Sequence, residues 1–115
     1  MAPKWLLRAE GAGILLMSVV FYAARGYSWW LFAILFLAPD LCMLAYLHSV
    51  SLGAKVYNLV HTEILPILLG LAGLLYVRGV LPYALIWLAH IGFDRMLGFG
   101  LKYPTRFNDT HLARV

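Results

Sequence analysis

The amino-acid sequence predicts an all-α membrane protein, a four-helix transmembrane bundle in up-down-up-down order with short loops and a short polar C-terminal tail. Of the 115 residues, 63% are hydrophobic and 12% are charged, whereas soluble domains contain about 45–50% apolar and about 25% charged residues. The apolar residues also form four stretches, each close to the ~20 residues that cross a bilayer. Because the connections between these stretches are short, neighbouring helices are expected to run antiparallel.

The four expected spans are separated by short segments that contain glycine, serine or arginine. They run over about residues 5–24, 29–49, 54–77 and 80–99, so that residues 1–101 form the transmembrane domain and residues 102–115 a cytoplasmic tail. Trp29 and Trp30 open the second span with aromatic rings suited to a membrane–water interface. Pro39 lies within that span and is expected to kink its helix.

The basic residues predict that both termini lie in the cytoplasm. Basic residues accumulate on the cytoplasmic side of membrane proteins. Here the N-terminal side carries Lys4, Arg8, Lys55, Lys102, Arg106 and Arg114, and the opposite side carries Arg25 and Arg78. Since these residues form no clustered basic face, nucleic acid is not an expected partner. Membrane lipids are expected, and a homodimer is one arrangement that would enclose a cavity.

Each expected span carries an acidic residue or a histidine at a similar depth. At 1.5 Å per residue, the groups lie roughly 9 to 13 Å inside the N-terminal side; they are Glu10, Asp40, His61 and Asp94, with His90 one turn deeper than Asp94. His90 and Asp94 are four residues apart, so a helix places both on one face. Ionisable groups at this depth are costly and therefore indicate a functional site.

This polar layer predicts a divalent metal ion, which could be zinc, iron or manganese. Facing helices of a bundle hold metals with histidine and carboxylate side chains. His61, His90 and Asp94 would give zinc three ligands and leave the fourth position to water. An iron or manganese pair would also recruit Glu10 and Asp40. Outside a ligand role, these two carboxylates are candidate catalytic proton acceptors.

Purely structural roles for the same residues are alternatives that stay open at this point. A single buried histidine is more often a hydrogen-bonded structural residue than a ligand. Asp94 and Arg95 can form an ion pair that anchors the helix end, and Glu10 can pair with Arg8 or Lys4 near the interface. Asp40 is the hardest to dismiss because it lies in mid-span without a neighbouring cation.

Two further polar residues share the side of His61. Tyr57 and Asn58 precede it by four and three residues, so a helix places them close to the imidazole ring. Hydrogen bonds from such neighbours orient metal ligands.

Three segments of the chain resemble a bacterial family of small integral membrane proteins, the domain of unknown function 4260. They are LAPDLCMLAY at 37–46, YNLVHTEILP at 57–66 and WLAHIGFDRMLGFGLKYPTRFNDTHL at 87–112. The resemblance implies four membrane spans and points to Glu10, Asp40, Asn58, His61, His90, Asp94, Arg95, Lys102 and His111. It thereby adds Arg95 as a catalytic candidate, and Lys102 and His111 as supporting polar groups. It also implies a location in the bacterial inner (plasma) membrane, and it implies no established activity.

Three classes of function are compatible with these features. The first is a metal-dependent membrane hydrolase or oxidoreductase acting on a lipidic or amphiphilic substrate, and Pro39-Asp40 with the His-x-x-x-Asp pair is faintly similar to membrane-bound metal-dependent hydrolases. The second is a proton-coupled transporter, because small multidrug-resistance exporters have a similar length and a glutamate early in their first helix, here Glu10. The third is a structural membrane subunit, in which Asp40 and His90 would tolerate apolar replacement.

Overall fold

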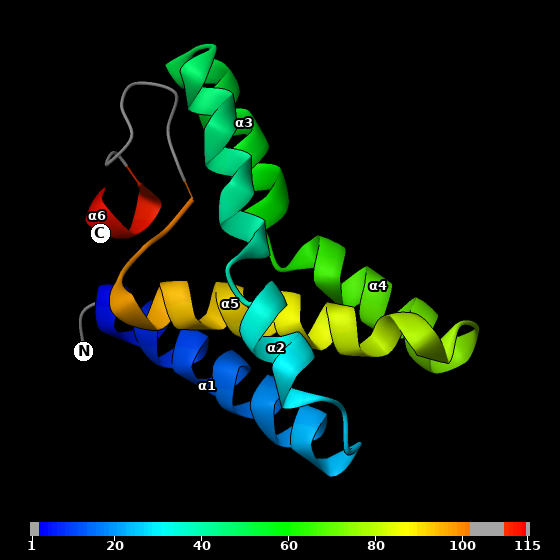
Figure 1. Ribbon diagram of the computed structural model, residues 1–115. Helices are drawn as coiled ribbons and strands as arrows, with labels where there is room; N and C mark the ends of the chain where they lie inside the picture. Colours follow the sequence, from blue (N-terminus) through cyan, green and yellow to red (C-terminus); the bar gives the residue numbers. More distant parts are fainter. Residues whose placement is uncertain (1–2, 102–109, 115) are drawn as a thin grey trace.

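The computed structural model describes residues 3–101 and 110–114, and these residues form helices joined by short turns (Figure 1). In chain order the α-helices are α1 (Pro3–Ala24), α2 (Trp29–Leu35), α3 (Val50–His61), α4 (Ile64–Leu75), α5 (Leu81–Leu97) and α6 (His111–Arg114). Two 3-10 helices complete the set, η1 (Ala38–Leu47) between α2 and α3, and η2 (Arg78–Val80) before α5. The predicted all-α class is confirmed.

Helix α5 is the central helix of the fold, and twelve of its 17 residues are buried. It runs antiparallel to α1, and α4 packs along its first half (Figure 1). Glycines allow the backbones of α1 and α5 to approach closely, as in other membrane helix pairs. A Cβ atom added at Gly92 would lie 2.7 Å from the Gly11 carbonyl oxygen, and one added at Gly11 would overlap Arg95. Any side chain at these two positions would therefore push the helices apart.

The second expected span is broken near its middle, as Pro39 predicted. Helix α2 ends at Leu35, and η1 starts at Ala38 with the proline in its first turn. A proline has no N–H to continue the preceding helix, and its ring clashes with the carbonyl group four residues earlier. The break places Asp40 in the first turn of η1, next to α5.

The third expected span is also built from two helices, which leave their junction in different directions (Figure 1). Helix α3 ends at His61 and α4 begins at Ile64, with Thr62 and Glu63 between them. Pro66 explains the position of this junction because its ring excludes a helical carbonyl at Thr62, four residues earlier. The junction turns the last residue of α3, His61, toward α5 and frees its carbonyl group for another partner.

Much of the surface of the described residues is apolar. Trp30, Ile34, Leu47 and Tyr76 are 72–86% exposed, although large apolar patches are rare on soluble monomers. Three segments are long and apolar enough to cross a membrane: Pro3–Ala24, Trp29–Leu47 and Val50–Leu75. These findings indicate a membrane protein. Helix α5 is shorter than those segments, so the count of four spans and the sidedness of the termini stay predictions.

The C-terminal segment returns to the end of α5. The Leu101 N–H donates to Nδ1 of His111 (2.7 Å), and the His111 N–H donates to the Leu101 carbonyl (2.9 Å). Leu112 is buried. The polar tail expected over residues 102–115 is described only at 110–114, and there it packs against the helical body.

The close contact of α1 with α5 predicts that Gly11→Ala destabilises the protein by about 1–3 kcal/mol, the usual cost of overpacking. Gly13→Ala is the matched control because a Cβ atom there meets nothing within 4 Å. Thermal unfolding of both variants in detergent measures the difference. Equal midpoints for the two variants would contradict the described packing.

The His111 contact predicts that the C-terminal segment undocks as the pH falls. Burial, together with the nearby Arg95 guanidinium, lowers the pKa of His111 below its ordinary value of 6.5. The neutral ring accepts the Leu101 N–H, so the docked state is stabilised fully above about pH 6.5 and loses that stabilisation as the pH drops through the lowered pKa. Hydrogen exchange at Leu101 between pH 8 and 5, corrected for its intrinsic pH dependence, should show the loss of protection. Constant protection over this range would refute the contact.

Candidate metal centre

Four side chains from three helices converge on one point between η1, α3 and α5. They are Asp40 of η1, His61 at the end of α3, and His90 and Asp94 of α5, and each offers a ligand atom within 4.8 Å of every other. The two breaks in the chain bring the first two residues to this point, while helical periodicity places the other two one turn apart. The expected four-residue spacing on α5 therefore does form one side of the site.

The distances between these atoms match a metal coordination shell. Nε2 of His61 lies 3.2 Å from Nε2 of His90, 3.2 Å from Oδ1 of Asp40 and 3.5 Å from Oδ2 of Asp94. Nε2 of His90 lies 3.1 Å from the same Asp40 oxygen and 3.2 Å from the same Asp94 oxygen. Ligands bound tetrahedrally at about 2.0–2.1 Å stand about 3.3–3.4 Å apart. Five of the six edges of the cluster thus agree with a tetrahedral site.

His61 is held in the tautomer that a metal ligand needs. Its Nδ1 lies 3.0 Å from the Tyr57 carbonyl oxygen, which can accept but not donate, so Nδ1 carries the proton. The neutral ring then has its lone pair on Nε2, pointing at the cluster. The Tyr57 ring stacks on the imidazole at 3.7 Å with an interplanar angle of 5° and fixes its plane. Such support of the distal nitrogen is typical of metal-binding histidines.

His90 is fully buried, and its ring packs edge-on against Phe36. Its Nδ1 has no hydrogen-bond partner among the described residues, while Nε2 faces the other three ligand atoms. When both histidines are neutral, three atoms of the cluster can only accept hydrogen bonds: Nε2 of His61 and the oxygens of Asp40 and Asp94. At most one N–H, that on Nε2 of His90, is directed at them. Two carboxylates and an imidazole lone pair repel each other in an apolar interior unless a cation or extra protons neutralise them.

The four groups differ in their access to the surroundings. The side chains of His61 and His90 are 0% and 1% exposed, that of Asp94 is 12% exposed and that of Asp40 is 33% exposed. Asp40 therefore forms the outer edge of the cluster. A molecule that approaches the centre from outside meets this carboxylate first.

Arg95 contacts the backbone next to the cluster but offers no ligand atom to it. Its guanidinium donates to the carbonyl of His61 at 2.9 Å and to that of Phe99 at 3.0 Å. The first bond satisfies the carbonyl that the junction at Thr62 leaves outside a helix. The ion pair considered between Arg95 and Asp94 is not found: the arginine makes contacts with backbone carbonyls instead.

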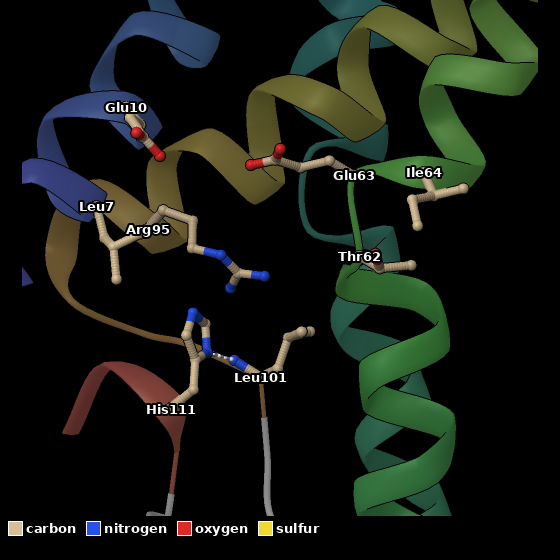
Figure 2. A pocket seen from close by; sticks show the side chains of 8 residues that line it. All are labelled: Leu7, Glu10, Thr62, Glu63, Ile64, Arg95, Leu101 and His111. Atoms are coloured by element: carbon tan, nitrogen blue, oxygen red, sulfur yellow. Dashed lines mark hydrogen bonds between the residues drawn. The ribbon is translucent and has the colours of Figure 1, made fainter. Parts of the chain in front are cut away.

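Glu10 does not belong to the cluster, although its expected depth had placed it there. Depth alone does not define the face of a helix, and in α1 it is Gly11 that faces α5 while Glu10 is exposed. Glu10 lines a separate pocket of about 260 Å³ with Glu63, Arg95 and His111 (Figure 2). Of the other expected residues, Asn58 is in α3, three residues before His61, and Lys102 lies outside the described residues.

Sequence reasoning missed two features of the centre. The junction after His61 was not expected, although Pro66 four residues beyond Thr62 was the available signal. The contact of Cys42 was also missed, and its sulfur lies 3.7 Å from Nδ1 of His61. At that distance the thiol contributes a weak polar contact to the imidazole edge.

The comparisons with known proteins agree with the resemblance seen in the sequence. The family model described as domain of unknown function (DUF4260) matches residues 4–115. No curated protein and no solved structure matches the chain. Because the family model covers nearly the whole length, the protein belongs to the family of the domain of unknown function DUF4260.

Proposed function

We propose that the protein is a membrane hydrolase that depends on a divalent metal ion and acts on a lipidic or amphiphilic substrate. The observation that carries the proposal is that the ligand atoms of His61, His90 and Asp94 lie 3.2–3.5 Å from one another. The Asp40 carboxylate is beside the same point, 3.1–3.2 Å from both imidazole nitrogens. A carboxylate accessible from outside, on a protein with a largely apolar surface, supports a substrate that arrives from the lipid phase.

In this proposal His61, His90 and Asp94 hold the ion, because they are the most buried groups and His61 has a fixed tautomer. A bound divalent ion would supply Lewis acidity, which lowers the pKa of a water molecule and polarises a carbonyl or phosphoryl oxygen. Asp40 is the general base: its carboxylate is the most exposed of the four and is within reach of the same point. It accepts the proton of the attacking water and returns it to the leaving group.

Oxidative chemistry is the second candidate, and one observation favours it. Two histidines and one carboxylate form the ligand set of many non-haem iron enzymes, which keep open positions for oxygen. An octahedral iron with ligands at about 2.1 Å would hold them about 3.0 Å apart. The observed 3.2–3.5 Å among His61, His90 and Asp94 supports a tetrahedral ion such as zinc instead.

The transport alternative has less support from the arrangement. It needs the first-helix carboxylate in the same polar layer as the histidines, so that protonation of one affects binding at the other. Glu10 instead lines a different pocket. A purely structural role for the layer also has less support, since neutral histidines supply too few donors for a satisfied hydrogen-bond network.

The central prediction concerns metal content. Purified protein should bind one divalent ion per chain, and His90→Ala should lower the affinity at least tenfold because it removes a ligand. Asp94→Asn should weaken binding less, since an amide oxygen can still coordinate. His48→Ala is the matched control because His48 is exposed and lies outside the cluster. Elemental analysis and metal titration measure both. Wild-type protein that neither carries nor binds zinc, iron or manganese would refute the proposal.

The proposal also predicts that metal binding weakens as the solution becomes acidic. Imidazole and carboxylate bind the ion in their deprotonated forms, so protons compete with the metal for His61, His90 and Asp94. Affinity measured by competition with a chelator should fall between pH 8 and 5, with correction for protonation of the chelator. Binding that is independent of pH would indicate a site other than these side chains.

A further inference from the structure

The pocket beside the metal centre is lined by three charged side chains, and Figure 2 shows them around one space. Arg95 comes from α5, Glu10 from α1 and Glu63 from the junction of α3 and α4. In this view the guanidinium lies between His111 on one side and the two carboxylates on the other. The pocket has a volume of about 260 Å³.

None of these three charges has an ion-pair partner among the described residues, where the recorded pairs are those of the His/Asp cluster. Arg95 is 7% exposed. It uses two of its five N–H groups on backbone carbonyls. Glu63 and Asp94 are near enough to act on the guanidinium electrostatically, but neither carboxylate lies within 4.0 Å of it. A buried guanidinium without a direct carboxylate contact is costly to keep. Glu10 is exposed and Glu63 is half-buried, so both carboxylates are accessible from outside. Together with the remaining donors of Arg95, they point to a ligand that carries charges of both signs.

His111 fits the same ligand. Since its Nδ1 accepts the Leu101 N–H, the neutral ring carries its proton on Nε2, where it is a donor. Arg95 and His111 together offer several N–H groups to an anion such as a phosphate. Glu10 and Glu63 offer acceptors to an ammonium group, and the net charge of the lining disfavours a simple anion. A headgroup that joins a phosphate to a primary ammonium matches both halves.

A second pocket, which is mainly apolar, lies on the opposite side of the metal centre. It has a volume of about 400 Å³, and its lining includes Pro39, Val60 and Trp87. In the sequence, each of these residues comes one to three positions before a ligand, namely Asp40, His61 or His90. In the charged pocket, Thr62, Glu63 and Arg95 instead come one or two positions after a ligand. Along α5 the order is therefore apolar pocket, metal ligands, charged pocket. The centre lies at the boundary between an apolar and a charged binding region.

We propose that the substrate is an acyl lipid with a phosphoethanolamine-type headgroup, bound with its chain in the apolar pocket and its headgroup in the charged pocket. This inference rests on the proposed hydrolytic function and names its substrate. The bond at the centre is the ester that joins the chain to the polar part. The water oxygen bonds to the acyl carbon, the carbon–oxygen bond to the alcohol breaks, and the alcohol takes the proton that Asp40 accepted.

Binding of a lipid that cannot be cleaved tests the substrate class separately from catalysis. The probe is a single-chain lipid with an ether link and a phosphoethanolamine headgroup, compared with the same chain carrying phosphoglycerol. Retention on the detergent-purified protein, kept in zinc-containing buffer, is measured by native mass spectrometry, and the ether link prevents cleavage. We expect the ethanolamine lipid to be retained about tenfold more tightly, because the two lipids share the same chain and differ only in the headgroup.

Two sets of variants locate the binding. Glu10→Gln combined with Glu63→Gln should reduce the tenfold preference to less than twofold while leaving metal content unchanged. Ala38→Phe should fill the apolar pocket and lower retention of both lipids, whereas Ala33→Phe, an exposed position outside that pocket, should not. Metal content of all variants reports separately on the metal centre and on folding.

Equal retention of the two lipids by the wild type would overturn the inference. It would also be overturned if soluble glycerophosphoethanolamine displaced the lipid at an equal concentration, because the apolar pocket would then contribute nothing. A failure of metal binding with a preserved headgroup preference would instead refute the hydrolytic function and leave the headgroup site in place.

Discussion

Charge neutralisation at the His/Asp cluster is the constraint on which the rest of the structure depends. Two carboxylate oxygens and two imidazole nitrogens lie within 4.8 Å of one another inside an apolar helical protein, and each nitrogen is 3.1–3.5 Å from both oxygens. Their mutual repulsion would separate η1, α3 and α5 unless a cation held them together. A divalent ion at this point would thus join three helices as well as supply chemistry, and its binding energy would contribute to the stability of the fold.

Two helix breaks bring ligands of the cluster to this point. Two prolines interrupt long apolar segments, and each break delivers a ligand: Asp40 after the first and His61 before the second. Irregular backbone inside a membrane is tolerated where it lines a cavity and where its polar groups find partners. Arg95 supplies such a partner by donating to the His61 carbonyl. The same arginine borders the charged pocket, so one side chain would both support the proposed metal centre and contact the proposed headgroup.

The sequence was sufficient for the helical class, for the polar residues of the centre and for the pairing of His90 with Asp94, because helical periodicity decides which residues share a face. It failed for Glu10, since depth in the membrane does not define the direction in which a residue faces. It also failed for the junction after His61, because a single span over residues 54–77 was expected although the Pro66 ring clashes with a helical carbonyl at Thr62. The meeting of Glu63, Arg95 and His111 depends on contacts between distant segments, which no local pattern encodes.

The coordination shell of the bound ion is the most direct measure of the central claim. X-ray absorption spectroscopy of the zinc-loaded protein should give four nitrogen or oxygen neighbours at about 2.0–2.1 Å, with the outer-shell scattering of two imidazole rings. His61 and His90 account for those two rings. An all-oxygen shell without imidazole scattering would contradict the account, because zinc would then be held elsewhere on the protein.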